Sequence, residues 1–200
     1  MPNQVALKIA IDLMHVPSQV RLFKTEPLPD GVLTLLRVAA GDEEADRVAI
    51  DLTGRSRETV RRAATFFIEQ ILFAADADSY RVLGANPQTS PGDLRRNVAL
   101  LLRWLHPDLD PRGEKSIFVG RVTAAWNNLK TPDRRAAYDE TQRNRMIDGK
   151  AGGGRRGKKR QFATIPRRNG RGPDVPSLSR ANKIGFLRRA LSVLLQRPLQ

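Results

Sequence analysis

Cysteine is absent from this sequence of 200 residues, and histidine occurs only twice, as His15 and His106. Without cysteine the chain has no disulfide, no thiol nucleophile and no cysteine ligand for zinc. Two histidines are too few for a histidine metal site or for a separate histidine-based triad. The acids are scattered, with no carboxylate pair spaced for general acid–base chemistry. The sequence therefore predicts a binding protein that is not an enzyme and that uses no cofactor or metal.

Acidic residues are also scarce at the C-terminal end. From Lys150 to Gln200 there are 14 Lys and Arg against a single acid, Asp174, whereas the first 149 residues hold 21 basic and 20 acidic residues. Almost the whole net charge of +14 therefore belongs to this tail. Residues 146–180 are rich in Gly and Arg and offer few apolar side chains to bury, so we expect a disordered basic linker there.

Such a linker predicts binding to polyanions through counterion release. Because aromatic residues are not interleaved with the charges, this binding would depend on salt and not on base sequence. A soluble linker without a dedicated partner is the equally weighted alternative. The candidate polyanion-binding residues are Arg155, Arg156, Lys158, Lys159, Arg160, Arg167 and Arg168.

Residues 181–197 predict an amphipathic helix with a narrow basic face and a broad apolar one. This helix would either fold back onto the domain or lie on an anionic membrane surface or a partner. We favour the membrane or the partner, because seven apolar residues left in water would promote aggregation. The apolar residues expected to make that contact are Phe186, Leu187, Leu191, Leu194 and Leu195.

Residues 1–75 predict a small N-terminal subdomain whose first 26 residues are ambiguous. Apolar and other residues alternate from Val5 to Leu13, which indicates a strand, with 20–23 as its partner; a helix is the competing interpretation. This opening stretch is too short and too charged to span a membrane, and it lacks the features of a secretory signal. We therefore expect a cytoplasmic protein.

Residues 27–75 predict helices. The first opens at Pro29-Asp30, runs to about Ala40 and is closed by Gly41, and the second ends at Gly54. Ser56 is expected to cap a third, long helix. Its apolar stripe predicts core packing, with a docking surface for a client as the less favoured alternative; the stripe comprises Val60, Ala63, Ala64, Phe67, Ile68, Ile71, Leu72 and Ala75.

The central stretch, residues 79–139, predicts an antiparallel helical hairpin. One amphipathic helix begins at Ser90-Pro91 and ends before Pro107, and a second with a matching apolar face ends at Thr131-Pro132. A shorter helix follows, through Tyr138. The hairpin places the tripeptide His106-Pro107-Asp108 at its exposed tip, where the proline holds the imidazole and the carboxylate at a fixed separation.

This stretch resembles the J-domain of DnaJ-type co-chaperones over about a third of the chain. The resemblance rests on the order and spacing of Tyr80-x-x-Leu83-Gly84, the tripeptide, Ala124-Ala125-Trp126, Leu129 and the run from Pro132 to Asp139. It implies a helical unit that binds a DnaK-type chaperone and triggers ATP hydrolysis by that partner. Carried over to this chain, the partner-binding residues are His106, Pro107, Asp108, Arg95, Arg96 and Arg103.

The sequence departs from that family at positions that are commonly basic. Ala99, Leu100 and Trp104 replace members of the basic row along the helix before the tripeptide, and Leu109 follows the tripeptide directly. Since electrostatic complementarity sets association rate and partner choice, we expect a weaker or different partner match. The absence of cysteine also excludes the zinc module of some larger J-proteins.

We therefore predict a mainly α protein. It comprises a small helical N-terminal subdomain (1–75), a J-domain-like unit with an antiparallel hairpin (76–145), a disordered basic linker (146–180) and an amphipathic helix (181–197). The favoured function is that of a co-chaperone supporting protein folding or remodelling. The alternative is an anion- or membrane-binding adaptor, with the J-like unit as its scaffold and a place at the inner face of the membrane.

Overall fold

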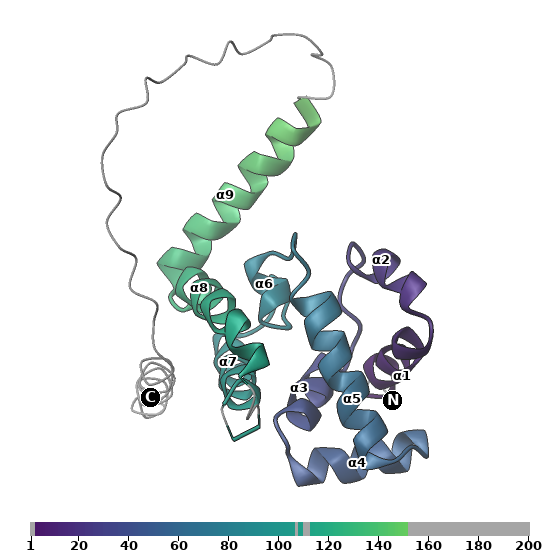
Figure 1. Ribbon diagram of the computed structural model, residues 1–200. Coiled ribbons are helices and arrows are strands. Elements are labelled where there is room, and N and C mark those ends of the chain that lie inside the picture. Colours follow the sequence, from purple (N-terminus) through teal and green to yellow (C-terminus); the bar gives the residue numbers. More distant parts are fainter. Residues whose placement is uncertain (1–2, 107, 110–112, 152–200) are drawn as a thin grey trace, which may run out of the picture.

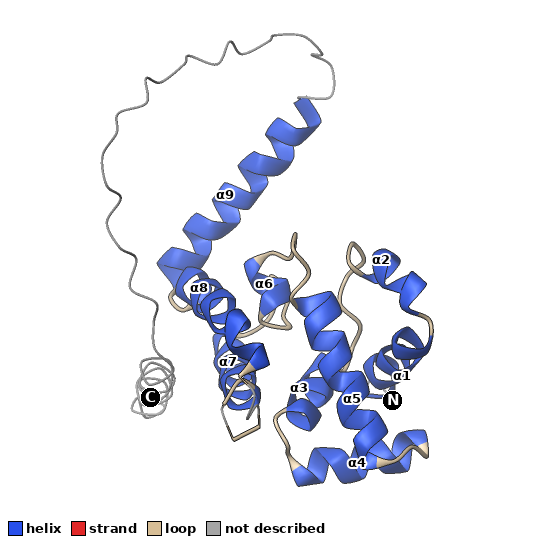
Figure 2. Cartoon of the chain, viewed as in Figure 1, coloured by secondary structure: helices blue, strands red, loops and turns tan. Residues whose placement is uncertain are grey.

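The computed structural model describes residues 3–106, 108–109 and 113–151, and these residues form helices without any strand (Figure 2). The predicted mainly α class is confirmed. The α-helices are α1 (Asn3–His15), α2 (Val20–Phe23), α3 (Val32–Ala39), α4 (Glu43–Thr53), α5 (Arg57–Phe67), α6 (Ser79–Val82), α7 (Pro91–Trp104), α8 (Val119–Leu129) and α9 (Pro132–Ala151). Short 3₁₀ helices cover Pro17–Gln19 and Glu114–Phe118, and a π-helix covers Ile68–Leu72.

The first helix settles the ambiguity at the start of the chain. Leu7, Ala10 and Leu13 are fully buried, and a spacing of three residues places them on one helical face, whereas alternate residues such as Val5 remain exposed. The strand interpretation of this stretch is therefore wrong and the helical one is confirmed. The predicted partner strand at residues 20–23 is also wrong, because those residues form α2.

Local capping explains where the next helices begin and end. Asp42 accepts hydrogen bonds from the backbone N–H groups of Glu44 and Ala45 at 3.1 and 3.2 Å and so caps α4, which ends at Gly54 with φ of 63°. Helix α3 begins two residues later than Asp30, because Gly31 has a left-handed φ of 94° that no helical residue adopts.

Helix α5 and the π-helix that continues it form the centre of the molecule (Figure 1). Their apolar stripe is buried against α1, α3 and α4, which confirms the core interpretation for every member except Ala75, which is exposed. The first half of the chain therefore folds around the stripe that the sequence indicates.

The second half contains the predicted hairpin of α7 and α8, and α9 projects from it away from the body (Figure 1). Helix α9 continues to Ala151, well beyond Tyr138, so its predicted end was wrong. A single buried cluster extends from α1 through α8, and α7 packs against α3. Within the described part of the chain, none of the helices is both long and apolar enough to span a bilayer.

Candidate functional site

The tip of the α7–α8 hairpin is positioned by the way α7 begins and ends. The Ser90 hydroxyl accepts a hydrogen bond from the backbone N–H of Asp93 at 3.1 Å, which fixes the first turn. After the last turn, the N–H of His106 donates to the carbonyl of Arg103 at 3.0 Å, and the N–H of Leu109 donates to the carbonyl of His106 at 2.9 Å. These bonds enclose the tripeptide in a tight turn; Pro107 itself lies outside the described residues.

His106 and Asp108 lie side by side in this turn. The ring nitrogen Nδ1 of His106 accepts a hydrogen bond from the backbone N–H of Asp108 at 3.3 Å and lies 3.2 Å from the Oδ2 atom of the same residue. The imidazole is 30% exposed and the carboxylate 86% exposed. The turn therefore orients an imidazole and presents a negative charge to solvent, an arrangement suited to recognition by another macromolecule.

The three arginines predicted to assist the tripeptide share one side of α7. At 100° per residue, Arg95, Arg96 and Arg103 fall within an arc of about 100°, and all three are exposed. The side chain of Arg96 forms an ion pair with Asp93 one turn earlier. Helix α7 thus has an exposed cationic side that ends close to His106.

A hydrogen-bond network ties the base of the hairpin to α6. The Tyr80 hydroxyl donates to the Asp139 carboxylate at 2.8 Å and accepts from Arg135 Nε at 2.9 Å. The Tyr138 hydroxyl accepts from the N–H of Ser79 at 2.8 Å. Burial, together with the hydrogen bond to Asp139, raises the pKa of Tyr80 to about 12. Tyr80, Tyr138 and Asp139, which contribute to the sequence resemblance, therefore hold α6 against α9.

The burial of Trp104 explains why one of the expected basic residues is absent from α7. Its side chain is 1% exposed, and its ring centroid lies 5.9 Å from that of Phe73 and 6.3 Å from that of Phe118. Position 104 thus belongs to the core between the hairpin and the end of the π-helix, where a lysine would be buried. Sequence reasoning missed this role, although a tryptophan three residues after the buried Leu101 was a usable signal.

The tip also lies close to the N-terminal helices, which sequence reasoning did not foresee. A Cβ atom built on Gly41, in the α3–α4 turn, would lie 3.8 Å from Leu109 Cδ2 and 3.9 Å from Arg61 Nη2. Leu109 and the guanidinium of Arg61 therefore both lie next to Gly41. Patterns within one helix carry no signal for such a contact between distant segments.

Residues 146–151, the first part of the predicted disordered linker, belong to α9, so the predicted start of that linker is wrong. The other tail predictions lie outside the described residues and stay predictions. They concern the basic linker and the amphipathic helix, and the residues are Arg155, Arg156, Lys158, Lys159, Arg160, Arg167, Arg168, Phe186, Leu187, Leu191, Leu194 and Leu195.

Comparison with known proteins connects part of the chain to DnaJ chaperones. It is 37% identical over 81 residues to Chaperone protein DnaJ 1 of Mycobacterium leprae, which covers 40% of this chain and 20% of the relative. It is 36% identical over 63 residues to Chaperone protein DnaJ of Leifsonia xyli, covering 32% and 17%. It is also 37% identical over 75 residues to human DnaJ homolog subfamily C member 16, covering 36% and 9%.

The chain thus spans a fifth or less of the length of these relatives. No family model matches it, and no solved structure matches it significantly. Each match covers only part of this chain and part of the relative. The matches agree with the tripeptide and the helical hairpin described above. This protein therefore contains a J-domain-like unit related to the DnaJ family of chaperones.

Proposed function

We propose that this protein is a co-chaperone that stimulates ATP hydrolysis by a DnaK-type chaperone, in support of protein folding or remodelling. The observation that carries the proposal is the tripeptide turn, in which His106 and Asp108 are held together at the tip of a capped hairpin. The chain supplies recognition and hydrolyses nothing itself. We place its action in the cytoplasm.

The geometry supports specific roles for the tip residues. The hydrogen bond to Asp108 uses Nδ1 of His106, so Nε2 is the ring nitrogen that meets the partner. The Asp108 carboxylate, being mostly exposed, accepts hydrogen bonds from partner cations or amides at little desolvation cost to the free protein. Arg95, Arg96 and Arg103 add positive charge for steering towards an acidic surface.

Single-turnover ATP hydrolysis by a DnaK-type chaperone from the same source tests this function. The wild-type chain is expected to accelerate hydrolysis, and His106→Gln is expected to reduce the acceleration to background. Because His106 is half-buried and lies at a helix end, the variant should keep the thermal unfolding midpoint of the wild type. Acceleration by the folded variant equal to that of the wild type would contradict the assigned role of the tip.

The alternative is an adaptor that binds anions or membranes through its tail and uses the J-like unit as a scaffold. The 14 basic residues against a single acid after residue 149 favour this candidate. In that case the chain acts at the inner face of a membrane or on a polyanion. Removal of residues 150–200 would then abolish binding to anionic vesicles and to nucleic acid, and His106→Gln would leave that binding unchanged. If the protein is a co-chaperone, His106→Gln abolishes the stimulation of ATP hydrolysis, and removal of residues 150–200 leaves it unchanged.

A further inference from the structure

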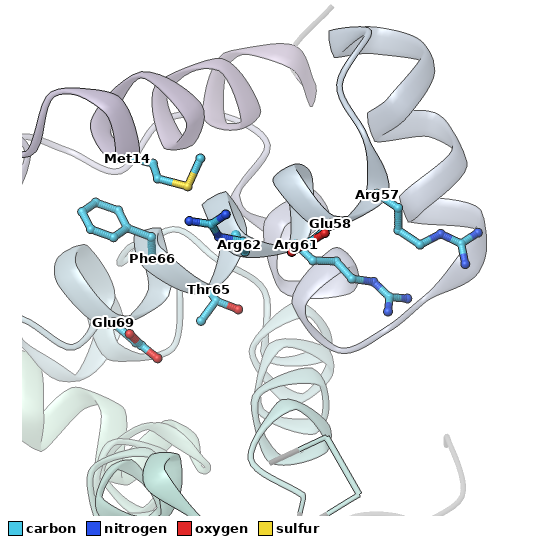
Figure 3. A pocket seen from close by; sticks show the side chains of 8 residues that line it. All are labelled: Met14, Arg57, Glu58, Arg61, Arg62, Thr65, Phe66 and Glu69. Atoms are coloured by element: carbon cyan, nitrogen blue, oxygen red, sulfur yellow. The ribbon is translucent and has the colours of Figure 1, made fainter. Parts of the chain in front are cut away.

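A groove on the N-terminal helices lies next to the hairpin tip. It is an open groove of about 640 Å³ along α5, with one side bounded by Met14 of α1 (Figure 3). Arg57, Arg61 and Arg62 lie along it, and Phe66 supplies an aromatic surface one turn further on. Arg, Met and aromatic side chains are enriched at protein–protein interfaces, so the lining has the composition of a protein contact.

The groove is connected to the tip through Arg61. This residue lines the groove. Its Nη2 atom and Leu109 Cδ2 both lie within 4 Å of a Cβ atom built on Gly41. A partner that covers Asp108 and Leu109 is therefore already at the edge of the groove. The tip and the groove therefore both border the α3–α4 turn at Gly41.

The arginines at this junction are held in place. Arg61 donates through Nε and Nη2 to the two oxygens of Asp46, at 3.2 and 2.5 Å, and Arg57 Nε lies 3.6 Å from the same carboxylate. The Asp46 side chain is fully buried, whereas the Arg61 side chain is 39% exposed. One buried acid thus orients two arginines, which lowers the conformational entropy that they lose on binding.

The charge of the groove suits an acidic partner only in part. Glu58 and Glu69 also line it, so the three arginines leave a net charge of +1 among the lining residues. Arg62 is exposed and is not needed to pair with Asp46. It is therefore the cation best placed to meet a carboxylate of a partner.

We infer that the DnaK-type partner contacts this protein across both the tip and the α5 groove. The inference rests on the proposed function, and it assigns to the N-terminal helices the cationic contact that α7 lacks at positions 99, 100 and 104. In DnaJ-like proteins generally that contact lies on the helix before the tripeptide. Here Arg62 and its neighbours on α5 supply it, together with an aromatic surface.

The test compares full-length variants that keep the buried ion pairs intact. Affinity for the ATP-bound DnaK-type chaperone is measured by biolayer interferometry, together with single-turnover hydrolysis. Arg62→Glu is expected to weaken binding by about tenfold, and Glu58→Gln is expected to strengthen it. Arg21→Glu makes the same charge change on α2, outside the groove, and is expected to bind like the wild type.

The outcomes separate this inference from the proposed function. If the wild type stimulates hydrolysis, His106→Gln does not, and Arg62→Glu binds as Arg21→Glu does, the groove assignment is overturned and the co-chaperone function stands. If the wild type neither binds nor stimulates, both are overturned. Sedimentation could instead show that the wild type self-associates and that Arg62→Glu does not. In that case the groove is an interface between copies of this chain, and the inference is again overturned.

Discussion

At the scale of single residues, Tyr80 couples the α6–α9 contact to pH. Its pKa of about 12 in the folded chain lies above the ordinary value of 10.0. Between these two values the unfolded chain loses the phenolic proton while the folded chain keeps it, so the free energy of unfolding falls as pH rises. Below pH 10 the proton is bound in both states, and this contribution is fully present.

The corresponding prediction concerns the slope of stability against pH. Urea unfolding followed by circular dichroism between pH 9 and 12 is expected to show a steeper loss of stability for the wild type than for Tyr80→Phe. The phenylalanine variant also loses the hydrogen bonds to Asp139 and Arg135, which at neutral pH should cost about 1–3 kcal/mol. Equal slopes for the two proteins would show that folding does not raise the pKa of Tyr80.

At the scale of elements, α7 has one packed side and one exposed, cationic side. One side packs on α8 and α3, and the other carries Arg95, Arg96 and Arg103. Trp104 belongs to the packed side, between Phe73 and Phe118. A lysine at position 104 would therefore place an ammonium group in the core.

We expect Trp104→Lys to destabilise the protein by about 3–5 kcal/mol, through loss of buried aromatic area and burial of a charge. Chemical denaturation measures the change. Ala99→Lys, on the opposite and partly exposed side of α7, adds the same charge and serves as the control, with an expected change of about 0.5 kcal/mol or less. A stability close to that of the wild type for Trp104→Lys would mean that position 104 is not part of the core.

Helix boundaries were predictable from sequence wherever a side chain caps the backbone. Ser90 and Ser56 each accept the backbone hydrogen bond expected of a helix cap at their positions. The length of α9 was not predictable from apolar spacing, because the stretch after Tyr138 has little apolar periodicity, although it contains good helix formers and no glycine before Gly149. The α5 groove and the role of Trp104 depend on contacts between distant segments, which local patterns do not specify.

At the scale of the whole molecule, the two halves of the described chain share one core. A Cβ atom on Gly84, after α6, would lie 3.0 Å from Val32 Cγ1 and 3.3 Å from Leu36 Cδ1, both on α3. The guanidinium of Arg81 donates to the backbone carbonyls of Phe23 and Glu26. The J-domain-like unit is therefore packed closely against the N-terminal helices.

A fragment of residues 76–151 is consequently expected to be much less stable than the full chain. Removing the N-terminal helices would uncover Trp104, which packs beside Phe73, and the turn at Gly84, which packs against Val32 and Leu36. Thermal unfolding and binding of a hydrophobic dye measure the effect, and the full chain without residues 152–200 is the control. A fragment that unfolds cooperatively at the same temperature as this control would contradict the shared core.

The close approach at Gly84 also bears on protein engineering. One engineering experiment would exchange the J-domain-like unit for a J-domain of another protein. In this protein such an exchange would bring a foreign side chain to position 104 and a foreign turn against Val32 and Leu36. A graft would have to carry α3 and the end of the π-helix with it, because these segments pack against the turn at Gly84 and against Trp104.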